Sequence, residues 1–392
     1  MTKILIVGGG VAALEATLAL QELAAELTEV ELVAPDSSFA YRPLLVTGDM
    51  RTFPLQRLTD DAGGSLRKGT VTRVDAERHV VHTAEGEELP FDLLLLSPGA
   101  IPAPALPGAL CFRGPGDAAE LEQMIEDALA GEVGSFVFAV PSGARWALPL
   151  YELALLTRAR LVDAGATGVR VTVVTPEDAP LELFGAQASA AIAELLDDRG
   201  IESVSGTIPL SFADGALSVA PGGAVTADRA VALPQLEGPR LQGLFSDPRG
   251  FLPTDPCGQV HGEIDIWAAG DATSFPLKQG GIAAQQADAA AESIAARAGA
   301  KLEPSPFRPV LRGLLLTGMS PRFLRAEGSP AASQVDTEPL WWPPAKIVGR
   351  YLAPFLARHL GLSELLPDAA RESAVPVEIE LDPAEHGVWS KV

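Results

Sequence analysis

The chain has 392 residues, of which 47% are hydrophobic and 20% are charged, a globular composition with enough apolar residues for two or three domains. Its formal net charge of −22 excludes nucleic acid as a partner, because phosphate binding requires a basic surface, and it disfavours electrostatic adhesion to anionic lipid. No apolar run reaches the roughly 18 residues that a membrane-spanning helix needs.

Cysteine is scarce: the chain contains only Cys111 and Cys257, with no C-x-x-C pair. This excludes a disulfide-stapled scaffold and a thiolate zinc site, and we expect no metal centre. Two free, buried thiols are the simpler expectation, and they favour a cytoplasmic protein.

Near its N-terminus the chain reads KILIVGGGVAALE, which predicts a buried strand, a glycine-rich turn and a helix running from Leu14 to about Leu27. Gly8 would allow the tight turn, Gly10 would let a pyrophosphate approach the backbone, and Ala13 would allow close packing of helix on strand. The helix N-terminus favours negative charge. The segment therefore predicts a dinucleotide site.

The strand–helix–strand pattern recurs at residues 135–178, so the sequence predicts an α/β protein with two nucleotide-type domains. Segments rich in proline and glycine at 98–117 and 233–254 predict the crossings between them. We expect a discontinuous first domain, an inserted second domain and a C-terminal region with an amphipathic helix. The predicted bounds are 1–110 with 250–320, 111–249 and 321–392.

A second informative segment, IDIWAAGDATS, predicts a strand that ends at Gly270 and Asp271. The Asp271 carboxylate could accept hydrogen bonds from a sugar-alcohol chain such as the ribityl group of a flavin. An Asx turn at the strand end is an equally good interpretation. The next helix is expected to begin near Gln279 and Gly280, where its dipole would stabilise negative charge on a flavin ring.

Together IVGGGVAALEA, YRPLL, LLLSPGA and WAAGDATSFPLKQGGIAAQQA make residues 1–320 resemble the two-domain flavoproteins of the pyridine nucleotide-disulfide oxidoreductases. Within them the chain is similar to sulfide:quinone oxidoreductases, flavocytochrome c sulfide dehydrogenases and type II NADH dehydrogenases. The resemblance implies two Rossmann-like, three-layer ββα domains and bound FAD. The residues that it places at FAD are Gly8, Gly10, Ala13, Pro98, Gly99, Gly270 and Asp271. We expect Arg42, Gln279 and Gly280 to be further cofactor-binding residues.

The sequence departs from this family at two nucleotide positions. The acidic residue that usually follows the second strand is displaced to Asp36, which is either a ribose ligand or a turn residue. The second domain reads AVPSGARWALPL where a nicotinamide-binding member has G-x-G-x-x-G, so NAD(P)H binding is doubtful. Arg145, Trp146 and Glu177 could still bind a second nucleotide or a substrate; the alternative is a core tryptophan and a solvated arginine.

Sulfide chemistry needs two cysteines beside the flavin. Cys111 resembles one of them, but the segment SGARW has no counterpart for the second, so we do not expect standard sulfide oxidation.

In the tail, residues 341–360 form an apolar stripe with a basic fringe, which could cover a quinone or dock on a membrane surface. A helix that packs on the flavin domain or forms a homodimer contact is the favoured alternative, and Pro354 is expected to kink it.

These observations predict an FAD-dependent oxidoreductase that moves two electrons from NAD(P)H or a small-molecule donor to an acceptor such as a quinone. Lys278 is a candidate for stabilising charge near the reduced ring, and a solvated lysine is the alternative. A second hypothesis is an FAD-bound binding or assembly protein with a vestigial redox site. A third is a peripheral subunit at the inner face of the membrane.

Overall fold

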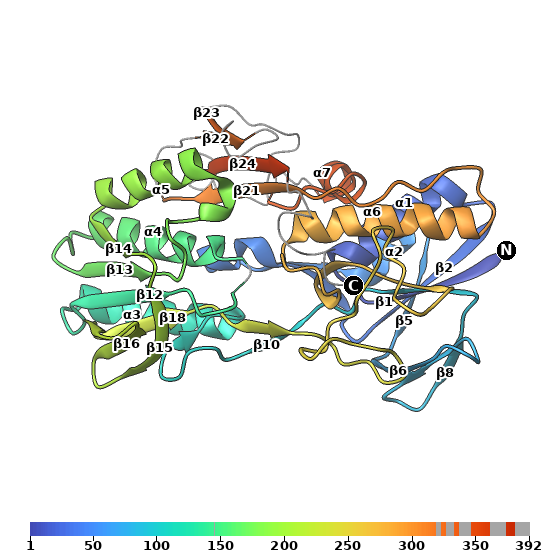
Figure 1. Cartoon of the computed structure of the whole chain (residues 1–392), viewed down its shortest axis with the longest axis horizontal. Helices are drawn as coiled ribbons and strands as arrows, with labels where there is room; N and C mark the ends of the chain where they lie inside the picture. Colours follow the sequence, from blue (N-terminus) through green and yellow to red (C-terminus); the bar gives the residue numbers. More distant parts are fainter. Residues whose placement is uncertain (145, 319–322, 327–332, 337–345, 361–373, 381–392) are drawn as a thin grey trace.

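The computed structural model describes the chain except for residues 145, 319–322, 327–332, 337–345, 361–373 and 381–392. Figure 1 shows two lobes side by side, each built around its own parallel β-sheet. The predicted α/β class with two Rossmann-like units is confirmed.

The first sheet has the order β20-β9-β1-β2-β5, and every neighbouring pair is parallel. Its central strands are apolar because both faces are covered: all four leucines of β9 are buried, as are the last four residues of β1. The strands are β1 (Thr2–Val7), β2 (Thr28–Ala34), β5 (Ser65–Lys68), β9 (Leu93–Leu96) and β20 (Ile266–Ala268). The carboxyl ends of β1, β9 and β20 therefore lie next to one another.

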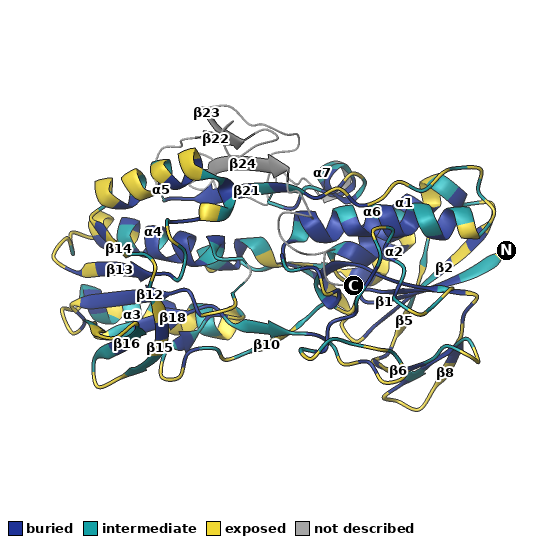
Figure 2. Ribbon diagram, in the orientation of Figure 1, coloured by how far each residue is buried: buried dark blue, intermediate teal, exposed yellow. Residues whose placement is uncertain are grey.

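Helices α1 (Val11–Ala24) and α6 (Gly280–Arg297) cover one face of this sheet. Both are rich in alanine, which allows close helix packing, and Figure 2 shows that most of α6 is buried. An antiparallel meander covers the other face through a separate apolar cluster, which gives the expected ββα layering. Its strands are β6 (Val71–Asp75), β7 (Val80–Thr83) and β8 (Glu88–Pro90).

Four further elements of this lobe lie between β2 and β5 in the sequence. They are β3 (Ser38–Tyr41), the 3-10 helix η1 (Arg42–Thr47), β4 (Arg51–Pro54) and α2 (Leu55–Asp61). A second short 3-10 turn, η3 (Gly270–Ala272), follows β20.

The second sheet, in the order β11-β18-β12-β13-β14, repeats this plan. Helices pack on one face, and a three-stranded antiparallel sheet packs on the other. The parallel strands are β11 (Leu110–Cys111), β12 (Ser135–Ala139), β13 (Arg170–Val174), β14 (Ile201–Val204) and β18 (Arg229–Ala232). The helices are α3 (Pro115–Leu129), α4 (Leu148–Asp163), α5 (Ala186–Asp198) and the 3-10 turn η2 (Glu182–Phe184). The antiparallel strands are β15 (Ile208–Ala213), β16 (Ala216–Ala220) and β17 (Ala224–Thr226).

The two crossings between the lobes run together, because β10 (Ile101–Ala103) pairs antiparallel with β19 (Gln235–Glu237). Figure 1 shows β10 between the lobes. The first sheet takes its strands from both sides of the segment that builds the second, as an inserted domain requires. The residue limits of the three regions stay a prediction.

The C-terminal region contacts both lobes. Residues of β21 (Val310–Leu316) enter the helix-side cores of both lobes. Leu314 and Leu316 pack in the core of the first lobe, the first core, and Leu311 and Leu315 pack in that of the second lobe, the second core. β21 pairs with β24 (Ala374–Glu380), and β22 (Phe323–Ala326) pairs with β23 (Ser333–Asp336).

Helix α7 (Leu352–Leu360) packs on α1. Its residues Leu352, Phe355 and Leu356 are buried in the first core, which agrees with the favoured alternative of a helix packed on protein. The expected kink was wrong, because the helix begins at Leu352 and Pro354 falls in its first turn, where no helical hydrogen bond is lost. Residues 341–345 of the predicted stripe lie outside the described residues.

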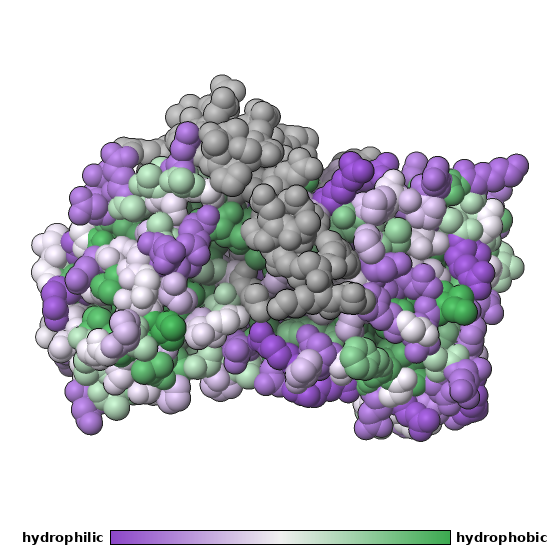
Figure 3. Space-filling view, viewed as in Figure 1, coloured by the Kyte–Doolittle hydropathy of each residue, from purple (hydrophilic) through white to green (hydrophobic). Residues whose placement is uncertain are grey.

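Over the described residues, no helix has both the length and the hydrophobicity needed to cross a bilayer. On the face shown in Figure 3, hydrophilic residues are distributed over the described surface of both lobes.

Replacing Leu20 tests the contact of α1 with the first sheet. Leu20 is fully buried in the first core, so Leu20→Ala should lower the free energy of unfolding by roughly 2–5 kcal/mol in a denaturant titration. Leu27→Ala, at a side chain that is 38% exposed just beyond the helix, should change it by about 0.5 kcal/mol or less. Equal effects of the two substitutions would contradict this packing.

Candidate functional site

A cavity of about 760 Å³ lies between the lobes, at the carboxyl ends of the first sheet, where open α/β sheets bind ligands. It brings together most of the predicted site residues from five separate stretches of sequence. The predicted residues among its lining are Gly8, Gly10, Asp36, Arg42, Pro98, Gly99, Trp146, Gly270, Asp271, Lys278, Gln279 and Gly280. Ala13 lies behind the lining, fully buried in the core beneath α1. Arg145 lies outside the described residues.

The glycine-rich turn leaves room for a ligand at Gly10 and has no room for a side chain at Gly8. Gly8 has φ +131°, and a Cβ there would overlap the carbonyl oxygen of Ser97 at the end of β9. Gly10 precedes α1, has no side-chain cap, and a Cβ there would meet no atom within 4 Å. The uncapped amides at the start of α1 therefore face the cavity, as a phosphate site requires.

The turn after β20 brings a carboxylate to the same cavity. Gly270 has φ +76°, and a Cβ there would lie 3.2 Å from Cβ of Ala12 in α1. Burial raises the pKa of Asp271, while the nearby Lys278 and Arg42 act to lower it. Asp271 thus reaches the lining from 260 positions further along the chain than the glycine-rich turn, beside two cations.

Lys278 is a buried member of the lining. Its Nζ donates a hydrogen bond to the carbonyl oxygen of Thr273 and lies 4.0 Å from the centroid of the Phe251 ring. The described side chain is 8% exposed, which excludes the solvated lysine that the sequence left open.

The side chain of Gln279 is engaged by the protein itself. Its Oε1 accepts from the Ile282 amide at 2.8 Å and caps α6, and its Nε2 donates to the carbonyl oxygen of Arg312 at 3.0 Å. Gly280 begins α6, and a Cβ there would lie 3.0 Å from Cγ1 of Ile347. Asp36 is exposed at the end of β2, so its part in ribose binding stays a prediction.

A buried ion pair that the sequence analysis missed also lines the cavity. Nζ of Lys346 lies 2.6 Å from Oε2 of Glu152, whose Oε1 accepts from the Leu316 amide at 2.8 Å. Burial raises the pKa of Glu152 and lowers that of Lys346, and each partner opposes the shift of the other. A charged residue within the apolar run PLYELALL was the signal available for Glu152.

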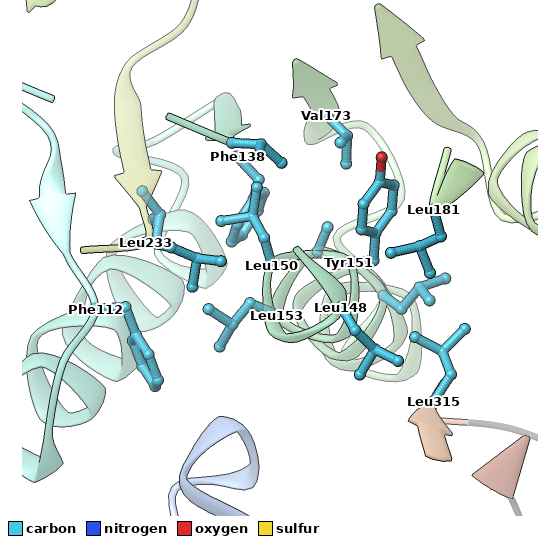
Figure 4. Packing of buried hydrophobic residues seen from close by; sticks show 14 of the residues in the cluster. Phe112, Phe138, Leu148, Leu150, Tyr151, Leu153, Val173, Leu181, Leu233 and Leu315 are labelled. Carbon is cyan, nitrogen blue, oxygen red and sulfur yellow. The ribbon is translucent and has the colours of Figure 1, made fainter. Parts of the chain in front are cut away.

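The start of α4, where a second dinucleotide would bind, is filled by apolar side chains. Figure 4 shows Leu148, Leu150 and Tyr151 of α4 inside the second core, and Leu150 and Tyr151 are fully buried. Trp146 packs edge-on against Phe184 with ring centroids 5.6 Å apart. Bulky side chains thus stand where a dinucleotide-binding turn needs glycine.

Glu177 is not among the residues that line the cavity. Its Oε2 accepts hydrogen bonds from the Tyr151 hydroxyl and the Thr175 hydroxyl, each at 2.8 Å. Burial raises the pKa of Glu177. Its carboxylate therefore joins β13 to α4, and a nucleotide-binding role stays a prediction.

Neither cysteine lines the cavity, and both are free. Burial raises the pKa of both thiols, which disfavours the thiolate that sulfur chemistry uses. Among the described residues, no group of three or more histidine, cysteine, aspartate or glutamate side chains could hold a metal ion.

The model of the pyridine nucleotide-disulphide oxidoreductase family matches residues 2–292. The chain belongs to this family. It is similar in structure to the sulfide:quinone oxidoreductase of the hyperthermophilic bacterium Aquifex aeolicus, with a TM-score of 0.70, 18% identity and 81% of each chain covered. It also resembles a ferredoxin reductase of Rhodopseudomonas palustris, with a TM-score of 0.62, 19% identity, and 84% of this chain and 86% of that one covered.

As a member of this family the protein is an FAD-dependent oxidoreductase. The cavity fits the cofactor, since Gly10 leaves open space in front of an uncapped helix N-terminus and Asp271 supplies an acceptor for hydroxyl groups. The residues that would hold FAD are those of the glycine-rich turn, the β20 turn and the start of α6.

Two glycine substitutions separate folding from FAD binding. Gly10→Ala adds a methyl group only to open space, so the thermal unfolding of the FAD-free protein should stay the same while FAD binds at least about tenfold more weakly. Gly8→Ala should destabilise the FAD-free protein itself, because its φ is +131° and a Cβ overlaps Ser97.

Flavin fluorescence quenching measures the first effect and a thermal scan the second. Gly168→Ala, in the other lobe with no atom within 4 Å of the added methyl, should alter neither. Unchanged FAD affinity in Gly10→Ala would contradict the assignment of this turn to the pyrophosphate.

Proposed function

We propose that the protein transfers two electrons from a small-molecule donor to a quinone-like acceptor, both of which reach FAD through the cavity between the lobes. The observation that carries the proposal is the contrast between the two lobes. The first has an open glycine turn at the large cavity, whereas the corresponding turn of the second, which also lines the cavity, carries Trp146 and Leu148 in place of small residues. Bound FAD supplies the two-electron chemistry.

The filled second lobe disfavours NAD(P)H as the donor. A dinucleotide on α4 would need close access to its first turn, but Leu148 and Pro149 occupy that turn and Trp146 packs beside it. A smaller donor does not need access to this turn.

The lining of the cavity supports a quinone-like acceptor. Leu45, Leu148, Phe275, Leu314 and Ile347 give it apolar walls, and the Glu152–Lys346 pair is set into them. One of the similar solved structures is a sulfide:quinone oxidoreductase; we extend the quinone to this chain, and not the sulfide, because neither cysteine lines the cavity.

Reduction of a quinone to its hydroquinone consumes two electrons and two protons. Glu152 and Lys346 hold a proton in a desolvated position, since burial shifts the pKa of each toward its neutral form. A group of this kind can act as a general acid toward a ligand in the cavity.

Reduction of the purified, FAD-loaded protein under anaerobic conditions tests the donor. We expect NADH and NADPH to bleach the flavin absorbance too slowly to support turnover. We expect sulfide not to bleach it. Rapid bleaching by either nucleotide would overturn the donor assignment. Reoxidation of dithionite-reduced protein by a water-soluble quinone tests the acceptor. Failure of the quinone to reoxidise the flavin would overturn the acceptor assignment.

Glu152→Gln should slow this reoxidation by about 100-fold in stopped-flow measurements, because the general acid is lost. The double variant with Lys346→Met, which leaves no unpaired buried charge, should show the same loss. Glu177→Gln is the matched control, a half-buried carboxyl group with a raised pKa that does not line the cavity, and it should react at the parental rate. Parental rates in both test variants would exclude this role.

A further inference from the structure

The start of α7 is capped by a side chain from the opposite end of the sequence. Glu15, in α1, is fully buried, and its two carboxylate oxygens accept from the amides of Tyr351 and Leu352 at 2.7 Å each. These are amides that the first turn of α7 leaves without a partner. Gly349 allows the approach, because a Cβ there would overlap Oε2 of Glu15.

A second carboxyl group completes this arrangement. Asp288, on α6, shares a hydrogen bond with Glu15, so one of the two groups must carry a proton. Oδ1 of Asp288 is buried, and no hydrogen-bond donor of the described residues contacts it. Burial and the charge of Glu15 raise the pKa of Asp288 to about 9, which makes Asp288 the protonated member.

Few charges surround the pair. Arg350, on the tail, faces it and acts to lower the pKa of Asp288, whereas Glu292 on α6 acts to raise it. Arg350 and Glu292 lie 3.5 Å apart as an ion pair. The charge of Glu22, on α1, acts to raise the pKa of the neighbouring Tyr351.

The segment that Glu15 anchors is also a wall of the FAD cavity. Lys346 and Ile347 line the cavity five and four positions before Tyr351. Lys346 pairs with Glu152, which also lines the cavity, and Ile347 packs on Gly280 at the start of α6. Holding Tyr351 and Leu352 in place therefore holds this wall in place.

We propose that Glu15 and Asp288 form a proton-dependent latch that keeps residues 346–352 closed over the cavity. Glu15 is a positioning residue that acts through the tail. The latch goes beyond the proposed electron donor and acceptor, and it requires only that FAD occupies the cavity.

The direction of the pH dependence follows from the shared proton. The closed state holds a proton on Asp288 that an ordinary, solvated carboxyl group with a pKa of about 4 releases at neutral pH. Opening therefore releases a proton, so closure is strongest in acid and weakens as the pH rises toward about 9, by up to tenfold per pH unit. Above that pH the dependence should level off.

Hydrogen exchange of the FAD-loaded protein between pH 6 and pH 9 tests the latch. The Tyr351 and Leu352 amides, corrected for the chemical exchange rate, should lose protection as the pH rises, and FAD release, followed by flavin fluorescence, should accelerate with them. Asp288→Asn keeps a donor to Glu15 but cannot titrate, so both slopes should disappear. Glu15→Gln, which presents only one acceptor oxygen, should lose protection at every pH and release FAD at least about tenfold faster.

Glu292→Gln is the control, because it removes a neighbouring carboxylate without touching the Glu15–Asp288 contact, and it should keep both slopes. Equal pH slopes in the parent and in Asp288→Asn would overturn the latch even if Glu15→Gln did not fold. Bleaching and reoxidation play no part in these readouts, so a wrong electron donor or acceptor would leave this result unaffected.

Discussion

The close approach of α1 to the carboxyl ends of β9 and β20 is the constraint on which the rest of this structure depends. Gly8 passes the end of β9 with no room for a side chain, and Gly270 leaves just enough space for Ala12 and Ala283 on either side. Because nothing larger separates these elements, the start of α1, the β20 turn and the start of α6 meet at one cavity. A dinucleotide can contact all three only while that spacing is kept.

The two lobes share one architecture but differ in the turn that precedes the first helix after the central strand. Each has a parallel sheet with helices on one face and an antiparallel layer on the other. In the first, small residues at the β1–α1 turn leave the helix N-terminus open to a ligand. In the second, Trp146 and Leu148 stand at the corresponding turn and helix start. The second lobe contributes a wall of the cavity, through Trp146 and Glu152.

Buried carboxyl groups tie the C-terminal region to this framework. Glu15 binds backbone amides of the tail, and Glu152 binds both Lys346 and the Leu316 amide of β21. A carboxylate taken out of water needs such partners, since an unpaired one would be strongly destabilising. Both carboxylates thus depend on residues more than 150 positions away in the sequence.

The sequence by itself determined the strands and helices whose periodicity is local, and the glycine-rich turn, because these depend on residues within a few positions of one another. It predicted β1, α1, β9, β20 and α6 close to where they lie, and it predicted that Gly10 and Asp271 belong to one ligand. It did not predict α3 or α5, and it did not predict that the side chain of Gln279, a residue expected at the cofactor, caps α6 and reaches Arg312. Only the tertiary structure decided that Trp146, Glu152 and Lys346 line the FAD cavity, that Glu177 does not, and that α7 lies on α1. Such contacts join residues far apart in the chain, and no local pattern records which distant partner satisfies a buried charge.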